Sequence, residues 1–218
     1  MKFVITGTQR SGTGYASRLL TAAGLECGHE AVFRPAATAV DFGDLAGDSS
    51  WLAVPWLRAI RMNAVPVFHQ VRHPIEVLRS AIGIGFFGHP RKFCAEETYL
   101  RTIWYYDKFV FSFDDAMRRA MAYWIRWNTA IEPHALRRHR LDQFDRSVLG
   151  FICSTVGHDL EPTQLDEALA EVESKYKGQY NHNARDETVT WESLPDDPLT
   201  EQFVALAQRY GYNPSESC

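Results

Sequence analysis

Apolar and polar positions alternate between short buried runs and helical stripes from the start of the chain. The run Phe3–Thr6 is apolar and is ended by Gly7, which predicts a buried strand. Tyr15, Leu19 and Leu20, spaced among alanines, predict a helix that ends at Gly24. The chain therefore opens as strand, glycine-rich loop and helix, the beginning of a β-α-β unit.

The same pattern continues along the chain. It predicts a second strand over 65–71, where Pro66 lies near the strand start, and a helix over 74–84 that begins at Pro74. A short strand is expected to begin at 140–141, and residues 175–187 are expected to form a loop. Further helices are predicted over 49–63, 115–138, 144–156, 162–175 and 197–210. Strands alternating with helices favour an α/β domain with a parallel sheet covered on both faces.

Composition narrows the class of protein. The chain has 218 residues, of which 45% are hydrophobic and 23% charged, so we expect one globular domain spanning 1–218. The net charge of −4 argues against broad nucleic-acid binding. No apolar run reaches the roughly 18 residues of a membrane span, and the start does not resemble a signal peptide. The scattered cysteines predict free thiols, no zinc site and a cytoplasmic location; they are Cys27, Cys94, Cys153 and Cys218.

The loop after the first strand is a candidate anion site. Residues 7–14 read Gly-Thr-Gln-Arg-Ser-Gly-Thr-Gly. Glycines let backbone N–H groups converge, and the following helix offers unpaired N–H groups and a positive dipole end. A Walker A loop has Lys and then Ser or Thr after its second glycine, whereas Thr13 and Gly14 stand here. No Walker B strand is evident, and a plain strand-to-helix turn is the alternative.

A second candidate anion site follows the second strand. Arg72 stands at the carboxyl end of that strand, where ligands bind in α/β folds, and Ser80 comes eight residues later in the next helix. An arginine and a hydroxyl so placed suit a phosphate. A surface arginine and an ordinary helical serine are the alternative.

Together these motifs resemble the sulfotransferase family. Residues 7–15 resemble its 5′-phosphosulfate loop, P-[KR]-S-G-T-[TS]-[WL], and residues 72–80 resemble its 3′-phosphate motif, R-[ND]-P-x-D-x-x-x-S, with His73 in place of Asn or Asp. Residues 27–30 (Cys-Gly-His-Glu) are similar to the C-G-E-E stretch of tyrosylprotein sulfotransferases. The resemblance implies a three-layer, P-loop-like fold with a helical lid. It also implies transfer of a sulfuryl group, without a metal, from 3′-phosphoadenylyl sulfate (PAPS) to a small-molecule, lipid or carbohydrate hydroxyl.

The resemblance also assigns roles to residues. Arg10 would stabilise developing charge, and Glu30 would act as the catalytic base, with His29 as the second candidate. Tyr15 would stack on adenine or else pack on the sheet. Lys177 and Arg185 would cover the 3′-phosphate or lie in a solvated basic loop, and the solvated loop is favoured. The remaining residues expected to bind the nucleotide are Ser11, Gly12, Thr13, Gly14, Arg72 and Ser80.

Two further expectations concern aromatic and histidine side chains. The aromatic residues of 86–113 would line an acceptor pocket or form core, and core is favoured. His69, on the second predicted strand, is interpreted as a structural histidine. Two other functions stay open: an ATP-dependent small-molecule kinase with a degenerate P-loop, and a nucleotide-binding module without catalysis.

Overall fold

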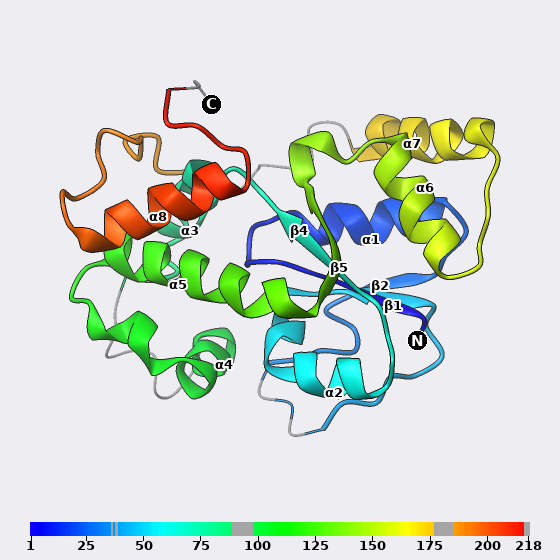
Figure 1. The fold of residues 1–218 in the computed structure, drawn as a ribbon, viewed down its shortest axis with the longest axis horizontal. Coiled ribbons are helices and arrows are strands. Elements are labelled where there is room, and N and C mark those ends of the chain that lie inside the picture. Colours follow the sequence, from blue (N-terminus) through cyan, green and yellow to red (C-terminus); the bar gives the residue numbers. More distant parts are fainter. Residues whose placement is uncertain (36, 38, 89–97, 177–184, 216–218) are drawn as a thin grey trace.

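The computed structural model describes residues 1–35, 37, 39–88, 98–176 and 185–215. Within these residues, five parallel strands form one sheet in the order β2-β3-β1-β4-β5. The expected all-parallel α/β sheet is therefore confirmed (Figure 1). The strands are β1 (Phe3–Thr6), β2 (Cys27–His29), β3 (Gly47–Ser49), β4 (Val67–Val71) and β5 (Ala135–Arg140).

Helices cover both faces of the sheet because successive strand residues point to opposite sides. Phe3 and Ile5 belong to one core, packed against α1, α6 and α7, whereas Val4 belongs to the other, packed against α2, α3, α5 and α8. We call these the α1-side core and the α5-side core. The helices are α1 (Thr13–Ala22), α2 (Leu57–Met62), α3 (Pro74–Gly83), α4 (Thr98–Tyr106), α5 (Ala116–Ile131), α6 (Arg146–Thr155), α7 (Pro162–Tyr176) and α8 (Pro198–Arg209).

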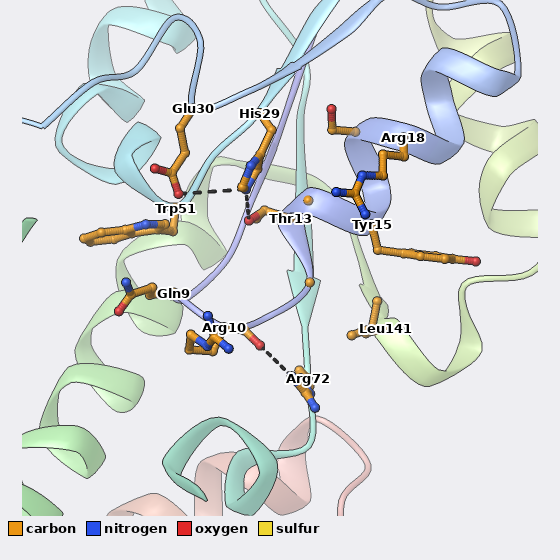
Figure 2. A pocket seen from close by; sticks show the side chains of 13 residues that line it. Gln9, Arg10, Thr13, Tyr15, Arg18, His29, Glu30, Trp51, Arg72 and Leu141 are labelled. Carbon is orange, nitrogen blue, oxygen red and sulfur yellow. Dashed lines mark hydrogen bonds and ion pairs between the residues drawn. The ribbon is translucent and has the colours of Figure 1, made fainter. Parts of the chain in front are cut away.

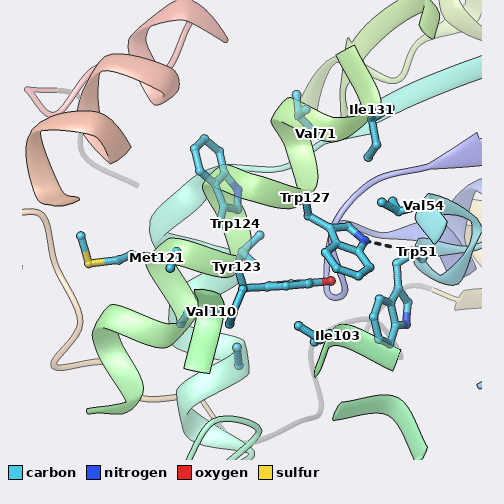
Figure 3. Packing of buried hydrophobic residues seen from close by; sticks show 14 of the residues in the cluster. Trp51, Val54, Val71, Ile103, Val110, Met121, Tyr123, Trp124, Trp127 and Ile131 are labelled. Carbon is cyan, nitrogen blue, oxygen red and sulfur yellow. Dashed lines mark hydrogen bonds between the residues drawn. The ribbon is translucent and has the colours of Figure 1, made fainter. Parts of the chain in front are cut away.

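Trp51, Tyr123 and Trp127 lie side by side in the α5-side core (Figure 3). The Trp127 indole Nε1 donates a hydrogen bond of 2.9 Å to the carbonyl of Trp51. This contact ties α5 to the short 3-10 helix η1 (Trp51–Trp56) that follows β3. The core thus reaches the carboxyl edge of the sheet.

The prediction of a helix over 115–138 is wrong at its end. Helix α5 stops at Ile131, a 3-10 turn η3 (Glu132–His134) contains Pro133, and β5 begins at Ala135. Proline lacks the N–H that continues a helix, and the next residues pair with β4 instead.

The helix predicted over 49–63 is also wrong in part. Ser49 ends β3, and only η1 and α2 are helical in that segment, with Pro55 inside η1. Strands β2 and β3 escaped prediction because each has only three residues, several of them small or polar. The helices expected over 74–84, 144–156, 162–175 and 197–210 are confirmed within two residues.

The aromatic stretch 86–113 forms α4 and the 3-10 helix η2 (Lys108–Ser112) in its described part. Phe87 is buried, as the core interpretation predicts, but Tyr105 is 71% exposed and Phe109 is 49% exposed. Trp104 and Tyr106 are also exposed. The core interpretation is therefore wrong for these four side chains.

The structural interpretation of His69 is confirmed, because this buried ring bonds Asn128 Oδ1 through Nε2 at 2.8 Å. Cys27 and Cys153 are free, as predicted, and both are buried. Cys94, Cys218 and Lys177 lie outside the described residues. Among the described helices, none combines the length and apolar character that crossing a bilayer requires.

Candidate functional site

A pocket of about 630 Å³ lies at the carboxyl edge of the sheet (Figure 2). Every strand leads into its lining: Arg10 follows β1, Glu30 follows β2, Trp51 follows β3, Arg72 follows β4 and Leu141 follows β5. Parallel strands end at one edge, so residues far apart in the sequence meet there. Its volume is in the range of small-molecule sites.

The glycine loop lies directly on β4. A Cβ on Gly7 would stand 2.1 Å from the Gln70 carbonyl oxygen, so only glycine allows this approach. The Gln70 side chain donates from Nε2 to the Ser11 carbonyl at 2.8 Å. From the other side, the Gln9 N–H donates to the Tyr123 hydroxyl at 2.8 Å. These contacts hold the loop at Gly7, Gln9 and Ser11.

The loop presents the N-terminus of α1 to the pocket. Gly12 precedes the helix with φ of 91°, and Thr13 and Gly14 begin it and line the pocket. Residues 13–16 carry no carboxylate, and Gly12 has no capping side chain. The positive end of the helix dipole is therefore available to an anion.

Arginines surround one side of this loop. Arg10 donates from Nε to Ser80 Oγ at 2.7 Å, and Arg72 donates from Nη1 to the Arg10 carbonyl at 3.1 Å. Burial lowers the pKa of the Arg10 guanidinium from its usual value, and the nearby Arg185 lowers it further. Burial also lowers the pKa of Arg72, against the opposing effect of Glu76. Both side chains remain cationic at neutral pH.

Glu76 binds three arginines at once. Its carboxylate lies 3.1 Å from Arg72, 3.1 Å from Arg79 and 3.0 Å from Arg185. Glu187 lies 3.6 Å from Arg79. With Arg10, four guanidinium groups face these two carboxylates, so the cluster keeps positive charge next to the pocket.

Glu30 and His29 lie across the pocket from this cluster, on the edge formed by β2 (Figure 2). His29 Nε2 is 3.2 Å from Thr13 Oγ1 and 3.8 Å from Glu30 Oε1. The Glu30 side chain is 20% exposed. Burial, together with Glu30, raises the pKa of the Tyr99 phenol, which places Tyr99 beside this carboxylate.

Most of the predicted site residues line one pocket. Ser11 and Ser80 are buried instead: the Ser11 N–H bonds the Thr8 carbonyl at 3.1 Å, and Ser80 accepts from Arg10. The predicted residues in the lining are Arg10, Gly12, Thr13, Gly14, Tyr15, His29, Glu30 and Arg72.

The Tyr15 ring packs edge-on against Phe144 of the α1-side core and also lines the pocket. Its stacking on adenine stays a prediction. The prediction that Arg185 is a solvated loop residue is wrong, because it pairs with Glu76 and is only 23% exposed.

Sequence reasoning missed several lining residues. Gln9 lies inside the glycine loop and could have been included with it, and Arg18 lies one helical turn beyond Gly14. Trp51 and Leu141 carry no local signal, because they reach the pocket only through the positions of β3 and β5.

Comparison of the sequence with models of known protein families and with curated proteins finds no match.

Proposed function

We propose that this chain is a sulfotransferase that moves the sulfuryl group of PAPS to a hydroxyl of a small-molecule, lipid or carbohydrate acceptor. The observation that carries the proposal is the composition of one pocket. It combines the N-terminus of α1, two partly buried arginines and, on the opposite side, a carboxylate. The motif resemblance of residues 7–15, 27–30 and 72–80 supports the same function.

The residues present fit a nucleotide that carries two separate anionic groups, a phosphosulfate and a 3′-phosphate. The end of α1, without a carboxylate in its first turn, would hold the phosphosulfate through the N–H groups of Thr13 and Gly14. Arg72 and the neighbouring arginine cluster would hold a second phosphate. Tyr15 and Leu141 offer an apolar surface for the adenine ring of the nucleotide.

When bound, PAPS supplies an activated sulfuryl group whose leaving oxygen gains negative charge. Arg10 is held by Ser80 at the loop and would stabilise that charge electrostatically. It does not donate a proton, because the guanidinium is not deprotonated in proteins.

Glu30 would accept the proton of the acceptor hydroxyl. It lines the pocket opposite Arg10, and its carboxylate is accessible to a ligand. His29 is the second candidate base, although its Nε2 already contacts Thr13 Oγ1. General-base catalysis typically contributes about 10²–10⁴-fold in rate.

The proposal extends to the fold and to the place of action. The sheet and its helices would form the sulfotransferase variant of the three-layer fold, with α4 as its helical lid, because Tyr99 of α4 stacks on Trp51 of the pocket at 5.8 Å. The free thiols of Cys27 and Cys153 suit the cytoplasm.

Ligand-induced thermal stabilisation tests the nucleotide site. We expect 3′-phosphoadenosine 5′-phosphate (PAP) at about 100 times its Kd to stabilise the fold by about 2.7 kcal/mol, which raises Tm by about 5–10 °C. Arg72→Ala should abolish the shift, whereas the exposed Arg58→Ala should retain it. A shift with ATP and magnesium but none with PAP would overturn the proposal in favour of the kinase.

Turnover tests the reaction. Wild-type protein with PAPS and a naphthol, glucose or octyl glucoside should release PAP and form a sulfate ester. Glu30→Gln should lower kcat by about 10²–10⁴-fold and leave the PAP-induced Tm shift unchanged. PAP binding without turnover in the wild type would instead support a module without catalysis.

A further inference from the structure

The turn that carries Glu30 is built around a buried carboxylate that no motif identifies. Asp48 lies in the middle of β3 and is fully buried. Its Oδ1 accepts the N–H of Ala31 at 3.1 Å, and its Oδ2 accepts those of Val32 and Phe33 at 3.3 and 3.4 Å. The three N–H groups directly follow Glu30 in the chain.

Glu30 itself has a strained backbone. Its φ is 54°, in the left-handed region that a side chain with a Cβ adopts only when its surroundings impose it. On one side its N–H approaches the Ser49 carbonyl at 3.4 Å. On the other side the Asp48 carboxylate holds the next three N–H groups. The strained residue is therefore fixed from both sides.

Gly28 of β2 makes room for this arrangement. It pairs with Asp48 across the sheet, and a Cβ on Gly28 would lie 2.6 Å from Asp48 Oδ1 and 2.7 Å from the Ala31 Cβ. A larger residue would push the carboxylate off the turn. Gly28 and Asp48 thus form one unit, the Gly28–Asp48 clamp.

We propose that Asp48 is a positioning residue for the reaction. Its carboxylate, admitted by Gly28, holds residues 31–33 so that Glu30 points its carboxylate into the pocket. This inference rests on the proposed function, because it acts through the base that function requires. Asp48 itself touches neither donor nor acceptor, since it is fully buried beneath the turn.

The test compares Asp48→Asn with a matched control, Asp44→Asn. Asparagine keeps the size of the side chain but turns one acceptor oxygen into an N–H donor facing the Val32 and Phe33 amides. We expect kcat for sulfuryl transfer from PAPS to the best of the three test alcohols to fall by about 10²-fold, the effect of misplacing a catalytic group by about 1 Å. The exposed Asp44→Asn should keep wild-type kcat.

Two readouts separate positioning from loss of structure. The PAP-induced Tm shift of Asp48→Asn should equal that of the wild type, because the glycine loop and Arg72 stand on β1 and β4. In a Glu30→Gln background, Asp48→Asn should lower kcat no further, because both changes remove the same contribution to the rate, general-base catalysis by Glu30. Gly28→Ala should reproduce the loss of kcat and provides a second variant.

Each outcome has a distinct meaning. Wild-type kcat in Asp48→Asn, or full additivity with Glu30→Gln, would overturn the positioning role and leave the proposed function standing. A wild-type chain that releases no PAP from PAPS with any of the test alcohols would overturn the proposed function, and this inference with it.

Discussion

Two residues of the glycine loop, Gly7 and Gly12, are constrained for different reasons. Gly7 could be recognised in the sequence as a strand terminator, but its contact with the Gln70 carbonyl could not, because the two are far apart in the chain. Gly12 differs: its constraint is the φ of 91°, and the atoms nearest a Cβ belong to the flexible end of Leu141. The first constraint is steric and the second is conformational.

Gly7→Ala should therefore be one of the most damaging small changes in the site. The new Cβ must displace the loop from β4. Such overpacking lowers the free energy of unfolding by about 1–3 kcal/mol. We expect a lower free energy of urea unfolding and a smaller PAP-induced Tm shift. Gly150→Ala, in helix α6, should keep the full PAP shift, because its nearest neighbour is the Leu165 side chain, away from the pocket.

At the scale of elements, strands β4 and β5 each place a buried histidine beneath the glycine loop, His69 on β4 and His139 on β5. His69 bonds Asn128, and His139 Nε2 lies 3.2 Å from Gln70 Oε1, the amide that also holds the loop at Ser11. The helix predicted through residue 138 concealed this strand. Only pairing with β4 makes residues 135–140 extended, so the polar network could not be read along the chain.

Both histidines make stability depend on pH. Burial lowers the pKa of His69 to about 4, with Arg138 as a further cause. Burial lowers the pKa of His139 to about 3, with His69 and then Arg137 as further causes. The unfolded chain binds protons below its histidine pKa of about 6.5, while the fold keeps both rings neutral. Stability is therefore present at pH 7 and is lost as the pH falls.

We expect each ring to lower the free energy of unfolding by about 2 kcal/mol between pH 6.5 and pH 5. Urea titrations at several pH values measure this slope. His139→Gln should make the loss between pH 6.5 and pH 5 smaller by the contribution of that ring, about 2 kcal/mol. An unchanged slope in that variant would contradict a neutral buried His139.

For the whole molecule, the two cores offer a test of the single-domain prediction. Of the six tryptophans, five lie in or against the α5-side core, and the sixth, Trp104, contacts Phe111 of that side. Tryptophan fluorescence therefore reports one face of the sheet, whereas far-UV circular dichroism reports the helices of both faces.

Leu149→Ala removes a fully buried side chain from the α1-side core. Truncations of this kind lower the free energy of unfolding by about 2–5 kcal/mol. In a chain of one cooperative domain, the fluorescence and circular dichroism transitions should coincide and both should move to lower temperature. A fluorescence transition that stays at its wild-type temperature would show that the two faces unfold independently.

The sequence by itself determined the local elements with strong apolar patterns and the two motifs that follow β1 and β4. Buried runs such as 67–71 and helices that begin at a proline, such as 74–83, depend on neighbours within a few residues, so their patterns are visible along the chain. The same holds for the glycine loop. These signals were enough to predict the parallel α/β sheet and to nominate a candidate anion site at its carboxyl edge.

The tertiary structure alone decided which residues share the pocket and what holds them. Strands β2 and β3 are too short to show a pattern. They form because β3 pairs with the edge of β1 and β2 then pairs with β3. Their order in the sheet brings Glu30, Asp48 and Trp51 together, and the fold brings Arg185 to Glu76. The physical reason is the same throughout: these contacts join positions distant in sequence, and no local propensity encodes them.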